Sequence, residues 1–137
     1  MKTFTRLGTV LVGGLLAVAA HATDHVTCFD DHRADGSIGV WTYDDYTDWK
    51  VAREAPRGTF VFSFSPGKDE YDVRDLHDCF FMPDPKRGET IQCGLGSVHL
   101  SHADAPRAIS GDYRFALLNG DIRSLKFDAS YCPPSQP

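Results

Sequence analysis

The chain lacks a second apolar stretch comparable to residues 7–20, has a single asparagine, and has no run of lysines and arginines. The first absence argues against a membrane span in the rest of the chain, because a span needs about 20 apolar residues. Asn119 does not begin an Asn-x-Ser/Thr site, so no N-glycan is expected. Without a basic run to attract phosphates, neither nucleic acid nor an anionic membrane is an expected partner.

Common catalytic motifs are also missing. The chain contains no Gly-x-Ser-x-Gly sequence and no glycine-rich phosphate loop. Acidic residues such as Asp44, Asp48 and Glu70 could act as a glycosidase pair only if the fold brings two of them to the required separation. We therefore expect a protein that is not an enzyme, with a small hydrolase as the least favoured alternative.

The first 22 residues have the pattern of a cleavable signal peptide. Lys2 and Arg6 give a positive start, residues 7–20 form an uncharged apolar run, and Ala20 and Ala22 supply the small residues of a cleavage site. The run is too short for a transmembrane helix. We predict a signal peptide over residues 1–22, with cleavage after Ala20 as an alternative.

The predicted mature chain is acidic. Without residues 1–22 it keeps 12 Lys and Arg against 19 Asp and Glu, a formal charge of −7. Its length suits one domain, which we place over 23–132, followed by a tail over 133–137. We expect it to be secreted, or periplasmic in the alternative, as a monomer or dimer.

Four cysteines remain in the predicted mature chain: Cys28, Cys79, Cys93 and Cys132. An even number in a short exported chain indicates disulfides, and the spacing does not suit zinc. Four cysteines allow three pairings. A hairpin centred on Lys86 would place Phe81 opposite Ile91 and Cys79 opposite Cys93, so we favour Cys79–Cys93 and Cys28–Cys132.

Turn residues divide the mature chain into short strands, and no convincing amphipathic helix is present. The clearest strand covers 59–65, where Phe60, Phe62 and Phe64 share one face that is buried against a core or a ligand cavity. The pattern predicts an all-β fold, a small antiparallel β-barrel or sandwich stapled by two disulfides. The other predicted strands cover residues 25–29, 38–43, 46–52, 70–73, 77–82, 89–93, 97–101, 113–118 and 121–127, and the longest loop covers 102–111.

Asn119-Gly120 is the strongest two-residue hairpin signal in the chain. A simple register around it puts Ile122 on the face of Tyr113 and Phe115, while Leu125 and Phe127 fall on the opposite face. A β-bulge near Arg123 and Ser124 would bring these side chains to one face, and we predict one there.

Two kinds of site are predicted. If cleavage follows Ala22, Thr23-Asp24-His25 provides an amine, two amides and an imidazole, which suit a square-planar Cu(II) or Ni(II) site. No other cofactor is expected. The acidic pairs are the candidate partner contacts: Asp30, Asp31, Asp44 and Asp45.

The order of cysteines and aromatic strands resembles a known family. Cys28 is followed by strands around Trp41 and Trp49, the Phe60–Phe64 strand, Cys79 and Cys93-Gly94 across a hairpin, and a closing Ala129-Ser130-Tyr131-Cys132-Pro133. This outline, over most of residues 25–132, resembles the Alt a 1-like (AA1-like) family of small secreted fungal proteins. The chain departs from the pattern in having no cysteine after Cys132, which leaves open whether Cys28 bridges two chains. The resemblance implies a compact antiparallel β-barrel, secretion and an effector-like, non-enzymatic role at a host interface.

Two functions of different classes follow from these features. The leading hypothesis is an effector-like, secreted β-barrel that contributes to virulence by binding a host protein or a small ligand. The alternative is a periplasmic inhibitor or immunity protein that blocks a lysozyme-like cell-wall hydrolase, because an acidic surface suits a basic enzyme.

Overall fold

The computed structural model describes residues 24–104 and 108–133. The elements are, in chain order, β1 (His25–Asp30), β2 (Ile38–Asp44), α2 (Trp49–Glu54), β3 (Thr59–Phe64), β4 (Glu70–Asp72), the 3-10 helix η2 (Val73–Asp75), β5 (Asp78–Met82), β6 (Ile91–Asp104), β7 (Ala108–Leu117) and β8 (Ile122–Tyr131). The predicted signal peptide lies outside the described residues.

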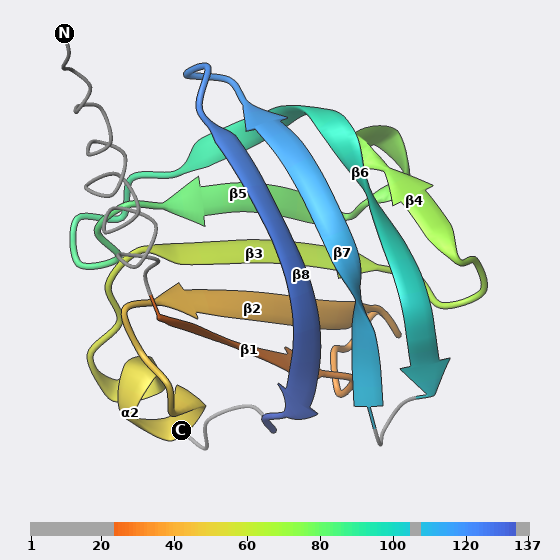
Figure 1. The fold of residues 1–137 in the computed structure, drawn as a ribbon, viewed down its shortest axis with the longest axis horizontal. Helices are drawn as coiled ribbons and strands as arrows, with labels where there is room; N and C mark the ends of the chain where they lie inside the picture. The colour runs from red at the N-terminus through yellow and green to blue at the C-terminus, as the bar shows by residue number, and fades with distance from the viewer. Residues whose placement is uncertain (1–23, 105–107, 134–137) are drawn as a thin grey trace, which may run out of the picture.

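Seven strands close into a β-barrel, which confirms the predicted fold class. The hydrogen-bonded order runs β6-β5-β3-β2-β1-β8-β7, and β7 returns to β6, while short β4 adds to the side of β6 (Figure 1). All neighbours are antiparallel except β1 and β8, which run parallel through Cys28–Ser130 and Phe29–Tyr131. The barrel is therefore closed by its first and last strands.

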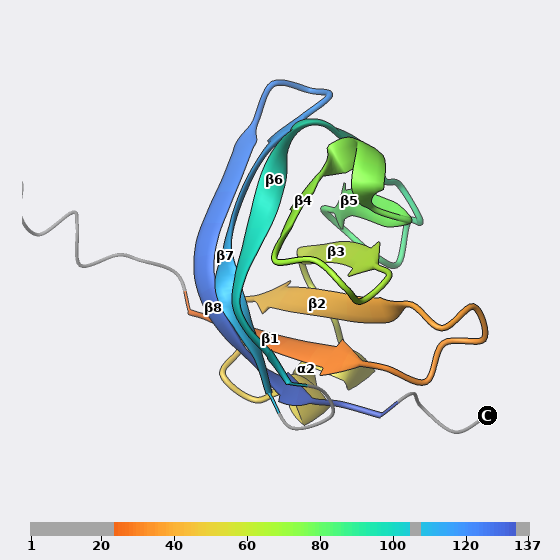
Figure 2. The same cartoon turned by 90° about the vertical axis from the view of Figure 1, so that its right-hand side faces the viewer.

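The barrel is flattened into two layers whose strands cross. In Figures 1 and 2, β1, β2, β3 and β5 form one layer, and β6, β7 and β8 run steeply across it in the other. The layers are joined at one corner by the β5–β6 pairing and at the other by the short β1–β8 pairing. The second corner is the one that shapes the candidate site below.

Aromatic side chains fill the space between the layers. Phe60, Phe62 and Phe64 are all at most 1% exposed, as predicted. Phe60 and Phe62 pack against Tyr113, Phe115 and Phe127 from the facing layer. The outward residues of β3 are buried as well, because every residue of Thr59–Phe64 is covered. Buried side chains therefore make up the region between the two layers.

Both predicted disulfides are present. Cys79–Cys93 joins β5 to β6 across the hairpin in which Phe81 faces Ile91, and Cys28–Cys132 joins the start of the barrel to its end. Among the described residues no cysteine is free. Two closed disulfides indicate an oxidising compartment.

Four predicted elements differ from the structure. Residues 46–52 do not form a strand. Asp48 is the N-cap of α2, because its side chain accepts a hydrogen bond from Lys50 N–H. Within this helix, the guanidinium of Arg53 stacks on the ring of Trp49, one turn away. The predicted strands 89–93 and 97–101 are one strand, β6, that bends through register shifts. The predicted loop 102–111 is mostly strand, since β6 continues to Asp104 and β7 begins at Ala108.

The predicted bulge at Arg123 and Ser124 is also wrong. The β7–β8 ladder is regular from Ile109–Ala129 to Ala116–Ile122. The connection has three residues, not two: Leu117 accepts from Gly120 N–H, and Gly120 has φ 96°. This one-residue difference puts Leu125 and Phe127 on the inner face without a bulge and turns Ile122 outward.

Candidate functional site

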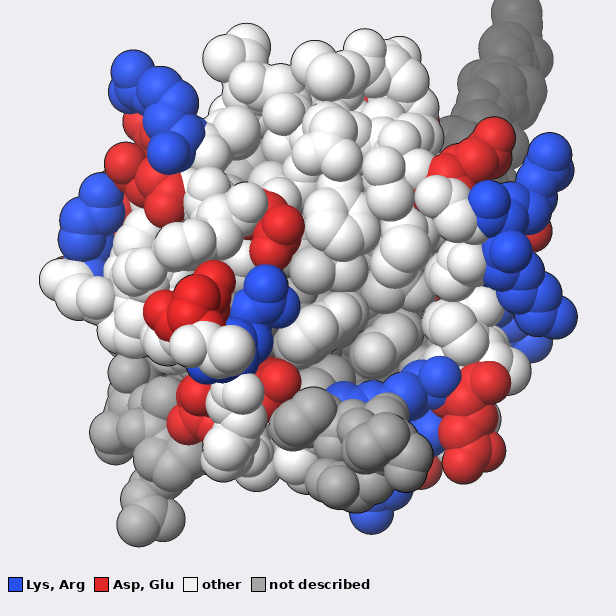
Figure 3. Space-filling view, turned by 180° about the vertical axis from the view of Figure 1, so that it is seen from behind, with Lys and Arg blue, Asp and Glu red and all other residues white. Residues whose placement is uncertain are grey.

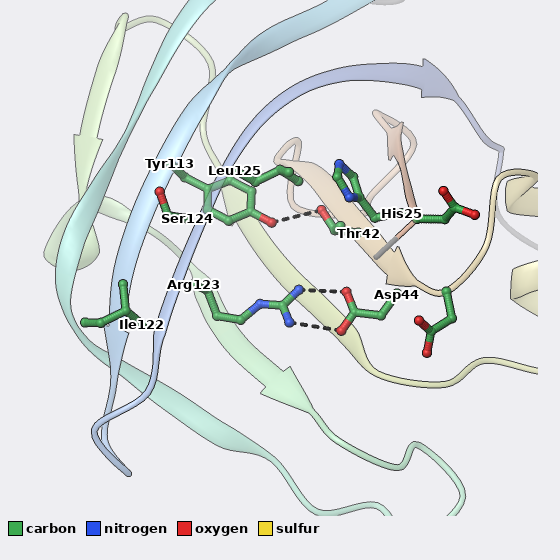
Figure 4. Close-up of a pocket in the computed structure, with 10 residues that line it drawn as sticks. His25, Thr42, Asp44, Tyr113, Ile122, Arg123, Ser124 and Leu125 are labelled. Carbon is green, nitrogen blue, oxygen red and sulfur yellow. Dashed lines mark hydrogen bonds and ion pairs between the residues drawn. The ribbon is translucent and has the colours of Figure 1, made fainter. Parts of the chain in front are cut away.

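A polar cleft of about 450 Å³ opens at the corner where β8 separates from β1. The two strands pair only at Ser130 and Tyr131, so the earlier part of β8 leaves a gap above the beginning of β1 and the end of β2. Figure 4 shows this region, which we call the seam cleft. It is lined by Asp24, His25, Thr42, Asp44, Asp45, Tyr113, Ile122, Arg123, Ser124 and Leu125.

The cleft holds a bidentate ion pair between Arg123 and Asp44. Nη1 donates to Oδ2 and Nη2 to Oδ1, each at 3.0 Å, and the side chains are 21% and 25% exposed (Figure 4). Burial alone would lower the pKa of Arg123, but the hydrogen bonds and charge of Asp44 outweigh it and raise that pKa. The pair spans the gap that backbone hydrogen bonds leave open between β8 and β2.

Neighbouring residues fit the ion pair closely. The guanidinium of Arg123 lies 4.5 Å from the ring centroid of Phe81 and 5.6 Å from that of Phe60, within cation–π range. The carbonyl of Gly58 accepts a hydrogen bond from Asp44 N–H, and a Cβ at Gly58 would lie 2.7 Å from Asp44 Oδ2. A larger residue at this position would push the Asp44 carboxylate away from its present place beside Arg123.

A chain of hydroxyl groups lies beside the ion pair. Tyr113 donates to Thr42 at 3.1 Å, and Thr42 is 3.1 Å from the hydroxyl of Thr27. Burial raises the pKa of the Tyr113 phenol, so this group stays neutral at physiological pH. It acts as a hydrogen-bond donor that joins the two layers.

The rim of the cleft is acidic. Asp24 and Asp45 are exposed, and Asp45 N–H donates to the carbonyl of Asp24 at 2.7 Å. Asp45 has φ 66°, a left-handed conformation that is uncommon outside glycine but more accessible to Asp. Three aspartates against Arg123 give the lining a formal charge of −2 with His25 neutral. The cleft suits a cationic group outside the neutralised Arg123–Asp44 pair.

The structure does not bring the four predicted contact residues together. Asp44 and Asp45 lie at the end of β2 and contribute to the cleft, while Asp30 and Asp31 lie at the far end of β1. Antiparallel pairing of β1 and β2 separates the two pairs by about 16 Å, at about 3.3 Å per residue. They cannot form one compact patch.

The group at the far end has its own arrangement. Asp30, Asp31 and His32 each offer one atom that could ligate a metal ion, and these atoms lie within 4.8 Å of one another. Asp30 accepts His32 N–H at 2.8 Å, and the hydroxyl of Tyr131 is 2.6 Å from His32 Nδ1. These bonds tie the ends of β1 and β8 together.

The predicted copper site is only partly described, since Thr23 lies outside the described residues. Asp24 and His25 are at the entrance to the seam cleft, and the carbonyl of Asp24 is engaged by Asp45. A square-planar site needs the amide nitrogens of both residues on one side, whereas a strand turns successive amides to opposite edges. Copper binding would therefore require residues 24 and 25 to leave their β conformation, and the site stays a prediction.

A serine, a histidine and an aspartate from separate segments of the chain lie next to one another at the surface. Ser65 Oγ is 2.7 Å from His77 Nε2, and His77 Nδ1 is 4.0 Å from Asp35 Oδ2. The second distance exceeds a hydrogen bond. The other carboxylate oxygen of Asp35, Oδ1, accepts from the backbone and hydroxyl of Ser37. With the His77 and Asp35 side chains 42% and 52% exposed, this group lacks the water-excluded setting that activates a serine nucleophile.

The opposite side of the barrel has a different character. Seen from behind, the surface is uncharged in its middle, with Lys, Arg, Asp and Glu toward its edges (Figure 3). A small hollow of about 130 Å³ on this layer is lined by Trp41, Tyr43, Arg53, Pro56, Thr59, Met82 and Pro85. It is less than a third the size of the seam cleft and contains one charged residue.

Sequence reasoning missed Arg123, Tyr113, Thr42 and Gly58 as site residues. Arg123 was missed because the connection of the hairpin has three residues, which places Arg123 on the inner face with Leu125 and Phe127. A lone arginine on an inward face needs an anionic partner, and Asp44 ends the strand nearest to it across the seam. Gly58 carries no comparable signal in the sequence.

Comparisons with protein family models, curated proteins and solved structures find no match to this chain. The fold and site therefore define a class only: a disulfide-stapled, seven-strand β-barrel with an acidic seam cleft. The resemblance to the Alt a 1-like family stays a prediction. Within the described residues, no helix has the length and apolar character to cross a membrane.

Proposed function

We propose that this protein is a secreted, non-enzymatic binding protein, effector-like in role, and that a basic partner docks at the seam cleft. The single observation that carries the proposal is the cleft itself, an opening of about 450 Å³ with a −2 lining. The large buried side chains between the layers, Phe29, Phe60, Phe62, Phe64 and Phe115, agree with binding at the outer surface. The signal-peptide pattern and two disulfides support export.

The surrounding structure supports binding without large rearrangement. The Arg123–Asp44 pair and the Tyr113–Thr42 hydrogen bond connect both walls of the cleft, and a disulfide closes the same corner through Cys28. A surface held in this way loses little conformational entropy on binding. We favour a protein partner over a small ligand because the cleft is open and borders further polar surface along β8.

Affinity capture with a charge-reversed variant tests this function. The mature protein, the double variant Asp24→Lys and Asp45→Lys, and a control with Glu54→Lys and Glu89→Lys are immobilised and exposed to extracellular or periplasmic extracts. All four positions are exposed, and both variants change the net charge equally. We expect a basic protein to be retained by the wild type and the control and lost by the cleft variant. Equal retention by all three baits contradicts the proposal.

The non-enzymatic part has a separate test at Ser65. A fluorophosphonate probe labels serines activated by a neighbouring histidine. We expect no labelling of Ser65 at neutral pH, since His77 is exposed and Asp35 is engaged by Ser37. Stoichiometric labelling that His77→Ala abolishes would show a nucleophilic site and contradict a non-enzymatic role.

One observation favours inhibition of a lysozyme-like hydrolase as a second candidate. The β7–β8 hairpin projects beyond the body of the barrel (Figures 1 and 2). Its tip exposes Leu118 by 71% and is held by hydrogen bonds between Asn119 and Asp121. A rigid, projecting loop can enter an enzyme cleft at low entropic cost.

A lysozyme assay decides this second candidate. We expect an excess of the mature protein to slow cell-wall lysis by a basic lysozyme, and Leu118→Asp to weaken this effect because it removes the apolar tip. Exposed Val51, on α2, supplies the matched control Val51→Asp. Full lysozyme activity in excess wild-type protein eliminates this candidate.

A further inference from the structure

The edge of β8 that faces the seam cleft has no strand beside it over most of its length. On its other edge, β8 pairs with β7 from Ile122 to Ala129. On the cleft edge it pairs with β1 only at Ser130 and Tyr131. Within the described residues, the backbone from Ile122 to Asp128 therefore presents one open sheet edge to the cleft.

The register identifies which backbone groups are open. Leu117 N–H donates to the carbonyl of Asp121, so these residues form a hydrogen-bonded pair. Such pairs alternate along an antiparallel ladder, so odd-numbered residues of β8 bond to β7. The even-numbered residues Ser124, Lys126 and Asp128 turn their N–H and C=O groups toward the cleft.

The opposite wall has a matching feature. Asp45 N–H donates to Asp24, so by the same alternation His25 turns its backbone groups away from β2 and toward the seam. Phe29 follows this parity, since its carbonyl accepts Cys132 N–H on the seam side. The cleft thus lies between two strand edges that diverge from their shared pairing at Ser130.

We infer that the partner enters the seam cleft as an extended basic segment that adds to the open edge of β8. This inference rests on the proposed function and states how its site works. Backbone hydrogen bonds to Ser124, Lys126 and Asp128 would supply strand pairing, a known mode of peptide recognition. Basic side chains on the segment would meet Asp24 and Asp45 on the rim, whose lining carries a −2 charge.

A second copy of the chain fits this edge less well. Antiparallel pairing of two β8 edges over the whole open window places Asp128 opposite the second copy's Ile122. It also brings the two Lys126 side chains to diagonal positions on one face. Opposed apolar and acidic residues and neighbouring like charges disfavour that arrangement. The acidic wall instead favours a basic strand.

Two synthetic heptapeptides serve as probes: acetylated, amidated (Lys-Val)3-Lys and its acidic counterpart (Glu-Val)3-Glu. Binding to the mature protein is measured by titration calorimetry, and protection of individual amides by NMR hydrogen exchange. We expect the basic peptide to bind at least tenfold more tightly than the acidic one. We also expect the N–H groups of Ser124, Lys126 and Asp128 to gain protection while those of Asp121 and Asp84, which lie outside the open edge, do not.

A proline variant separates strand addition from general charge attraction. Ser124→Pro removes one N–H from the open edge and leaves the β7 ladder intact, because proline is tolerated where that group faces outward. The control Ser124→Thr keeps the N–H. We expect about tenfold weaker binding for the proline variant and a change within twofold for the control. Lys126→Pro provides a second test if NMR spectra show that Ser124→Pro does not fold.

Four results would overturn the inference, and the last of them leaves the proposed function intact. The first is equal binding of the two peptides, and the second is equal affinity of the proline and threonine variants. The third is a dimer of the protein alone that Ser124→Pro dissociates, which would assign the edge to a second copy. If Ser124→Pro leaves captured partners unchanged while the Asp24 and Asp45 reversal removes them, strand addition fails and the proposed function stands.

Discussion

At the scale of single residues, the seam depends on side chains that replace missing backbone pairing. Arg123, Asp44, Tyr113 and Thr42 connect β8 and β7 to β2 where β8 and β1 have separated. Breaking a buried ion pair by removing one partner is strongly destabilising, because the other charge is left without compensation. The same residues therefore determine both stability and the shape of the cleft.

Gly58→Ala should disturb this arrangement without removing any polar group. A Cβ at Gly58 would lie 2.7 Å from Asp44 Oδ2 and 3.1 Å from Phe81 Cζ. We expect a loss of about 1–3 kcal/mol in the free energy of unfolding, measured by urea denaturation. In an Asp44→Ala background, the loss of unfolding free energy caused by Gly58→Ala should be smaller by about 1 kcal/mol or more, because one of the two close contacts is removed. Equal losses in both backgrounds would show that Asp44 is not the obstacle.

Tyr113 predicts a dependence of stability on alkaline pH. Burial raises the pKa of its phenol above the unfolded value near 10, so the folded state favours the neutral form. The resulting stabilisation is complete below about pH 10 and is lost as pH rises toward the folded-state pKa. Tyr113→Phe removes the hydrogen bond to Thr42 and should lower the free energy of unfolding by about 1 kcal/mol at pH 7. Above pH 10, the stability of this variant should fall less steeply with pH than that of the wild type.

Urea denaturation at pH 7 to 11 measures this effect. Tyr43 also has a pKa raised by burial, so part of the alkaline slope should remain in the variant. Tyr46→Phe, at a partly exposed phenol outside the cleft, controls for the general loss of a tyrosine. An alkaline slope identical in Tyr113→Phe and wild type would contradict the assignment.

At the scale of elements, local patterns predicted the strands better than their connections. Alternating phenylalanines identified β3, and the opposed cysteines identified the β5–β6 register. Residues 46–52 alternate as a strand would, yet Asp48 caps a helix, and the Asn119-Gly120 signal hid a connection of three residues. The seam site could not be predicted, because it depends on that one-residue shift and on where β8 leaves β1.

The two disulfides should contribute unequally to stability. Cys79–Cys93 closes a loop with a sequence separation of 14, and Cys28–Cys132 one of 104. Chain entropy assigns about 3 kcal/mol to a 15-residue loop and about 4.7 to one of 100 residues. We expect paired alanine substitutions at Cys28 and Cys132 to lower the free energy of unfolding by about 1–2 kcal/mol more than those at Cys79 and Cys93. The reverse order, in denaturant titrations, would contradict the entropic account.

At the scale of the whole molecule, maturation and export are open to a direct measurement. We expect intact mass spectrometry of the exported protein to give a monomer beginning at Thr23 that gains four hydrogens on reduction, two for each disulfide. A Cys28-linked dimer would contradict closure within one chain, and a different first residue would remove the predicted copper site. With the start at Thr23, equimolar Cu(II) should produce a square-planar visible band that His25→Ala abolishes.

The parallel pairing of β1 and β8 also sets an order of events in time. β1, the first strand of the barrel, gains its second neighbour only after β8 has been made, so the aromatic core cannot be closed before that point in synthesis. The β5–β6 hairpin and its Cys79–Cys93 bond can form early, whereas the Cys28–Cys132 bond must wait until residue 132 has been made. Folds dominated by contacts between distant parts of the chain assemble slowly, and their unpaired strand edges and apolar side chains stay exposed in the meantime. Nascent chains of this protein should therefore need protection from aggregation until residue 132 is complete.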